Sequence, residues 1–183
     1  MIGNNFLKNK KGFTLVELLT AITIFSISIV GFLNLFSWSI KYQRESLIEG
    51  YLIDSTSYFF DYLTRSLRMA QKDIQGSCTG NARLNYFVSD DLKRIKFLNS
   101  KGECIEFYLE SNNLKISKSE ISLPLLPQDI ILEDIKFFVS GQLQEDNLQP
   151  KITISAKIKN NENPPKVFYV QTTISQRQLD VQY

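Results

Sequence analysis

The sequence predicts an α+β protein in which one long N-terminal helix continues from a membrane into a head of antiparallel strands. Residues 13–40 are apolar or small apart from Glu17, and the chain then turns amphipathic with a helical period. Beyond residue 80 the apolar residues alternate with a period of two, as in half-solvated strands. We therefore expect a membrane-spanning helix at 13–40, an amphipathic helix at 41–75 packed on the head, and an antiparallel β head at 76–183.

The apolar segment is long enough to cross a bilayer. A helix over residues 13–40 would extend about 42 Å, against a hydrocarbon core of about 30 Å. A cleaved secretory signal is typically apolar over only about 7–15 residues. The lysines that precede the segment, Lys8, Lys10 and Lys11, favour a cytoplasmic N-terminus.

The amphipathic half predicts a single uninterrupted helix, because no proline precedes Pro124. Its expected buried side comprises Ile48, Leu52, Ser55, Phe59, Tyr62, Leu63, Ser66 and Ala70. Six strands are expected in the head: Ile95–Asn99, Cys104–Glu110, Leu114–Ser117, Ile135–Ser140, 152–159 and Val167–Ser175. Loops are expected at 124–127, 144–150 and 160–165.

Composition excludes several classes of function. The chain has no histidine, which removes histidine-based triads and HExxH metal sites. Without the three leading lysines it holds 18 basic and 19 acidic residues, so charge gives no case for nucleic-acid binding. We predict no catalytic residue, no metal site and no cofactor.

Three charged groups in the head are candidate sites. The acid pairs Asp90–Asp91 and Glu133–Asp134 are interpreted as solvated turns, with no spacing typical of a calcium loop. A basic and aromatic group fits a solvated hairpin edge as well as a nucleic-acid contact. Its members are Lys93, Arg94, Lys96, Phe97 and Lys101.

Glu17 is costly at the start of an apolar helix, by about 2–3 kcal/mol or less near an end. The helix dipole offsets part of this cost, and a new amine at Phe13, made by a cut after Gly12, would offset more. Residues 10–17, KKGFTLVE, together with the apolar run that follows, resemble the class III signal of type IV pilins and pseudopilins. The resemblance implies a leader peptide at 1–12, cleavage between Gly12 and Phe13, and N-methylation of Phe13.

The resemblance also implies partners and a location. These are the prepilin peptidase/N-methyltransferase, other major and minor pilins or pseudopilins, a filament assembly platform and membrane lipid. The chain would enter the inner membrane with a cytoplasmic N-terminus and an extracytoplasmic head, and then a filament. Segments 58–70, 105–117 and 170–178 are similar to J-type pseudopilins and W-type minor pilins.

We expect Glu17 to act in assembly, by pairing with the Phe13 amine of a neighbouring subunit. A stripe of small residues on the same side of the helix is a candidate helix-packing face. It comprises Thr20, Ala21, Ser28 and Gly31. The alternative is a signal-anchored binding protein or a hydrolase that never enters a filament.

The two cysteines predict a disulfide. Cys78 and Cys104 are 26 residues apart, both on the expected extracytoplasmic side, and no C-x-x-C motif accompanies them. The bridge would join the end of the long helix to the strand that begins near Cys104. Two buried free thiols are the alternative.

Overall fold

The computed structural model describes residues 12–118, 121–142 and 148–178. The lysines of the expected leader therefore lie outside the described residues. The chain divides into two compact units, Met1–Ile48 and Glu49–Tyr183, and the helix α1 (Leu15–Arg68) contributes to both.

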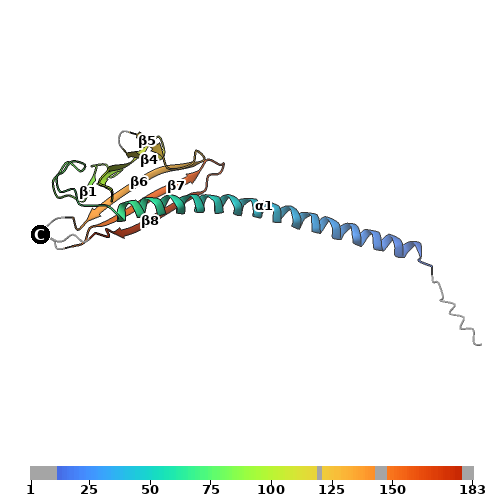
Figure 1. The fold of residues 1–183 in the computed structure, drawn as a ribbon. Coiled ribbons are helices and arrows are strands. Elements are labelled where there is room, and N and C mark those ends of the chain that lie inside the picture. Colours follow the sequence, from blue (N-terminus) through green and yellow to red (C-terminus); the bar gives the residue numbers. More distant parts are fainter. Residues whose placement is uncertain (1–11, 119–120, 143–147, 179–183) are drawn as a thin grey trace, which may run out of the picture. The chain divides into compact units, whose positions relative to one another are not determined.

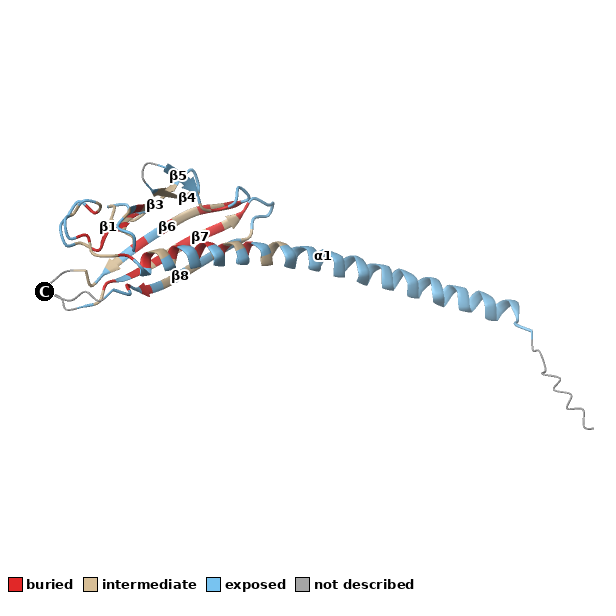
Figure 2. Cartoon of the chain, in the orientation of Figure 1, coloured by how far each residue is buried: buried red, intermediate tan, exposed pale blue. Residues whose placement is uncertain are grey.

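The first unit consists of the N-terminal part of α1. Glycine and proline weaken or break helices. Between residues 15 and 48 of α1 there is one glycine, Gly31, and no proline. An 18-residue window of α1 has a mean hydropathy of 2.1, and none of it is buried (Figure 2). By length and composition, α1 can cross a membrane.

The second unit opens with the C-terminal part of α1, which buries one face against the head. The buried residues are Leu52, Thr56, Phe59, Phe60, Leu63 and Leu67. The predicted side included Leu52, Phe59 and Leu63 correctly, but Tyr62 is 40% exposed. Helical spacing alone does not distinguish the side of α1 that carries Tyr62 from the neighbouring side that carries Phe60 and Leu67. Contacts with the rest of the head bury the second of these sides.

The helix ends at Arg68, seven residues before the predicted end at residue 75. Its last carbonyl groups find partners in distant segments. The Tyr86 hydroxyl donates to the Leu67 carbonyl at 2.8 Å, and the backbone N–H of Arg177 donates to the Arg68 carbonyl at 2.8 Å. Because these contacts satisfy the free helix end, the chain can leave the helix there.

The first sheet has five antiparallel strands in sequence order (Figure 1). They are β1 (Tyr86–Val88), β2 (Arg94–Leu98), β3 (Cys104–Glu110), β4 (Asn113–Lys118) and β5 (Ile121–Pro124). The strands β2, β3 and β4 match the sequence prediction to within a residue at each end. The strands β1 and β5, which are only three and four residues long, were not predicted from the sequence.

The second sheet has three antiparallel strands in the order β6 (Ile130–Ser140), β7 (Lys151–Asn160) and β8 (Val167–Ser175). The predicted alternation holds in β7, which buries Ile152, Ile154, Ala156 and Ile158. The strand β6 begins five residues before its predicted start and has a register shift between Leu132 and Asp134.

A single core joins both sheets to α1 within this unit. Its largest fully buried side chains are Tyr86, Phe59, Phe97, Phe107 and Phe137. Backbone hydrogen bonds from β6 to the first sheet's turns hold the sheets together, at 2.9 Å from the Leu132 N–H to the Asn112 carbonyl. The unit is thus an α+β head, as the sequence predicts.

Candidate functional site

The residues around the expected cleavage point lie just before α1. Gly12, Phe13 and Thr14 are outside regular secondary structure, and the helix begins at Leu15. The Phe13 side chain is 86% exposed, and a Cβ atom added at Gly12 would meet nothing within 4 Å. This junction is therefore accessible and lies outside the helix.

Thr14 and Glu17 form a reciprocal capping box at the start of α1. The Glu17 Oε2 atom accepts hydrogen bonds from the Thr14 backbone N–H at 3.0 Å and from the Thr14 hydroxyl at 3.1 Å. In return, the backbone N–H of Glu17 lies 3.2 Å from the Thr14 hydroxyl oxygen. The Thr14 side chain and Glu17 therefore satisfy N–H groups that the first helical turn leaves without intrahelical partners.

This geometry adds to the sequence interpretation. There the helix dipole and a new Phe13 amine offset the cost of Glu17, and in the structure the carboxylate also accepts two hydrogen bonds within its own chain. The T-x-x-E spacing ahead of an apolar run is itself a sequence signature of a capping box, and it makes Thr14 a further functional residue. Pairing of Glu17 with a neighbouring amine stays a prediction.

The small polar residues of the apolar segment use their hydroxyls within the helix. Thr20 donates to the Glu17 carbonyl at 3.0 Å, and Ser28 donates to the Ile24 carbonyl at 2.9 Å. These bonds let hydroxyl residues lie in lipid without a partner helix. Gly31 leaves open space beside the backbone. The packing face at Thr20, Ala21, Ser28 and Gly31 stays a prediction.

Aromatic and basic residues gather at the C-terminal end of the apolar segment. The rings of Trp38 and Tyr42 have centroids 6.0 Å apart, and Lys41 lies between them in the sequence. Tryptophan and tyrosine are enriched where a membrane meets water, and lysine extends its ammonium group from such a position into water. Trp38–Tyr42 therefore has the composition of a membrane–water boundary.

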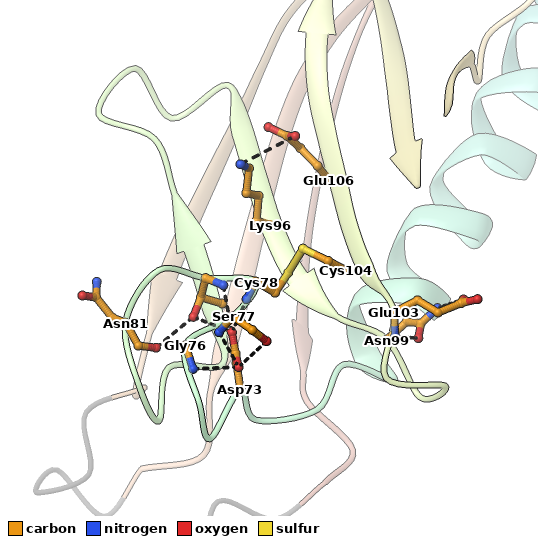
Figure 3. Close-up of a disulfide and its surroundings, with 11 residues drawn as sticks. Asp73, Gly76, Ser77, Cys78, Asn81, Lys96, Asn99, Glu103, Cys104 and Glu106 are labelled. Carbon is orange, nitrogen blue, oxygen red and sulfur yellow. Dashed lines mark hydrogen bonds and ion pairs between the residues drawn. A yellow bond between two sulfur atoms is a disulfide. The ribbon is translucent and has the colours of Figure 1, made fainter. Parts of the chain in front are cut away.

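Cys78 and Cys104 form a disulfide in the head (Figure 3). Cys104 is the first residue of β3, as expected, but Cys78 lies in a loop ten residues after the end of α1. The bridge therefore fastens this loop to the first sheet, whereas the sequence interpretation placed it at the helix end.

Asp73 shapes the same loop. Its carboxylate accepts backbone hydrogen bonds from Gly76, Ser77, Cys78 and Thr79, at 2.7–3.2 Å (Figure 3). Burial raises the pKa of Asp73, but the hydrogen bonds from Thr79, Cys78 and Ser77 outweigh it, so the pKa lies below its ordinary value. The charged carboxylate thus fixes the backbone that carries Cys78.

The basic and aromatic group of the sequence analysis does not form a common surface. Phe97 is fully buried, and Arg94 and Lys96 both pair with Glu106, at 2.6 and 3.8 Å. Lys93 pairs with Asp134 at 2.9 Å. Since the Phe97 ring is in the core, it cannot serve as a stacking surface for single-stranded nucleic acid.

The predicted position in a turn is wrong for Glu133 and Asp134, which lie within β6 at its register shift. Hydrogen bonds from Lys157 and Lys159 hold the pKa of Glu133 at about 2, so this carboxylate is a poor proton carrier near neutral pH. Asp91 accepts hydrogen bonds from the Ser89 hydroxyl and the Lys93 N–H within the turn before β2. Within the described residues, no group of three or more His, Cys, Asp or Glu could hold a metal ion.

Comparison with known proteins identifies the N-terminal part of the chain. The model of a family described as the prokaryotic N-terminal methylation motif matches residues 7–33. This range contains Gly12, Phe13, Thr14 and Glu17, together with the first part of the apolar segment. No curated protein and no solved structure matches the chain.

Proposed function

We propose that this chain is a structural filament subunit and not an enzyme. The premise is that the chain is pilin-like and carries the prepilin-type methylation motif. The subunit would be a minor pilin or pseudopilin of a type IV pilus or a type II secretion filament. The observation that carries the proposal is the accessible Gly12–Phe13 junction directly before a capped, membrane-length helix. A plain membrane anchor needs the helix but has no use for this junction.

Processing comes first in the proposed sequence of events. The prepilin peptidase cuts after Gly12 at the cytoplasmic side, where the leading lysines remain, and the new Phe13 amine is methylated. The capping box is C-terminal to the cut, so the helix start survives processing. The mature chain then remains in the membrane through residues 13–40, with the Trp38–Tyr42 boundary on the extracytoplasmic side.

Assembly follows through the apolar helix. Packed among other pilin-like helices, the cationic Phe13 amine loses water and needs an anion, and Glu17 lies at the same end of the helix. A neighbour displaced along the filament axis brings its amine to this carboxylate. The small residues Thr20, Ala21, Ser28 and Gly31 would allow close approach of the helices. The assembly platform and its ATPase would be separate proteins.

The N-terminus of the mature protein tests this function. In cells that contain the peptidase, mass spectrometry of the membrane-extracted protein should find a chain that begins at Phe13 with one added methyl group. Gly12→Val is the matched control, because it changes only the residue before the cut and should leave the chain uncut. A dominant species that still begins at Met1 would contradict the proposal.

A further inference from the structure

A groove in the head is lined by basic side chains from two segments far apart in the sequence. It has a volume of about 870 Å³ and lies between the last turns of α1 and the end of β8. Arg65 and Arg68 line it from the helix, and Arg177 lines it from the segment after β8. Among the described residues, Asp61 is the single acid in its lining. We name this feature the arginine groove.

The backbone brings the two walls of the groove together. Asp61, Arg65 and Arg68 follow helical spacing along one side of α1. Thr173 and Ser175 follow the period of two in β8, and Arg177 lies two residues beyond the end of this strand. The backbone hydrogen bond from the Arg177 N–H to the Arg68 carbonyl, at 2.8 Å, joins the two walls. The fold therefore holds the backbones of Arg68 and Arg177 next to each other.

The groove has an excess of positive charge over its own acid. Arg65 pairs with Asp61 at 3.0 Å, with both side chains largely exposed, and among the described residues of the lining this leaves the positive charges of Arg68 and Arg177. The Arg177 guanidinium also approaches the Met69 sulfur at 3.9 Å, a contact that balances no charge. A guanidinium presents paired N–H donors that match a carboxylate.

We propose that the arginine groove binds a carboxylate-bearing, extended peptide segment of a neighbouring pilin-like subunit. The choice of a protein partner rests on the proposed function, whereas the choice of ligand chemistry rests on charge. The second unit as a whole holds 16 basic and 17 acidic residues, so it lacks the long-range field that gathers a polyanion such as nucleic acid. A local excess of positive charge in a head that is nearly neutral overall suits a short acidic segment.

Binding of a defined acidic peptide tests the proposal. Labelled hexaglutamate is titrated with the full-length protein in detergent at low salt, and fluorescence anisotropy gives the Kd. Arg68→Gln and Arg177→Gln should each weaken binding about two- to fivefold, since each removes one charged contact. Arg83→Gln, which removes an exposed guanidinium outside the groove, should change the Kd less than about twofold.

A further variant separates binding from a purely structural role. Asp61→Asn removes the acid that competes for Arg65, and hexaglutamate should then bind more tightly, by about two- to fivefold. Weaker binding by Asp61→Asn, unchanged binding by both arginine variants, or no binding by the wild type would overturn the proposal. Tighter binding of a dodecathymidine oligonucleotide than of hexaglutamate would also overturn it. Since no filament is involved, these outcomes are independent of N-terminal processing.

Discussion

Glu17→Gln separates the two roles of this side chain. Glutamine keeps the side-chain oxygen that accepts from Thr14, and it occurs at this position of capping boxes. It removes the charge that would pair with a neighbouring Phe13 amine. The helix start, cleavage after Gly12 and folding of the head should therefore be preserved in this variant, while entry into filaments should fail.

The two roles differ in magnitude. Loss of an N-terminal cap costs about 0.5–2 kcal/mol, whereas loss of one partner from a buried ion pair costs about 3–5 kcal/mol. The second range corresponds to a roughly 100- to 4,000-fold reduction in the equilibrium for incorporation. Thr14→Val is the matched control, since it breaks the capping box but keeps the carboxylate, and it should reduce incorporation about 30-fold or less.

The assay compares each variant in sheared filaments with the same variant in membranes, by quantitative mass spectrometry. Glu17→Gln should remain in the membrane fraction as a cleaved protein. Moving the acid, in Glu17→Gln combined with Thr20→Glu, should not restore incorporation. If Glu17→Gln enters filaments at the wild-type level, or if Thr14→Val is equally defective, capping rather than charge pairing explains this residue.

Three further predictions concern the head. Cys78→Ser/Cys104→Ser should lower the free energy of unfolding by about 3 kcal/mol in the chain-entropy model, measured by urea denaturation; an unchanged midpoint would refute a constraining bridge. Asp73→Asn should destabilise the head by about 1.5–3 kcal/mol at pH 7, because the charged carboxylate accepts the loop's N–H groups. The pKa of Asp73 in the folded protein lies below its ordinary value of 3.8. The contribution of this carboxylate to the free energy of unfolding is therefore complete above pH 3.8, and it is lost as the pH falls through the folded pKa. The gap between wild type and Asp73→Asn in thermal melts should therefore close below about pH 4, and a constant gap would exclude the charge as the cause. Tyr86→Phe should cost about 1–3 kcal/mol, because it leaves the Leu67 carbonyl without its buried donor, and a neutral effect in the same melts would contradict that capping role.

Local patterns explain how much of this molecule could be predicted from its sequence. The membrane-length helix follows from uninterrupted apolar residues, and β7 follows from the alternation of Ile152, Ile154, Ala156 and Ile158. The N-terminal motif is also local, since its residues all lie within a few turns of one another. These features depend on neighbours in the chain, so residue order was sufficient to predict them.

Contacts between distant segments decided the rest. The helix ends at Arg68 because Tyr86 and Arg177, which lie 18 and 109 residues further along the chain, supply donors to its last turn. The stripe of α1 that is buried depends on where the sheets lie, and the arginine groove exists only because Arg177 returns to the end of the helix. No periodicity encodes such long-range hydrogen bonds, since their entropic cost is repaid only when the whole core forms.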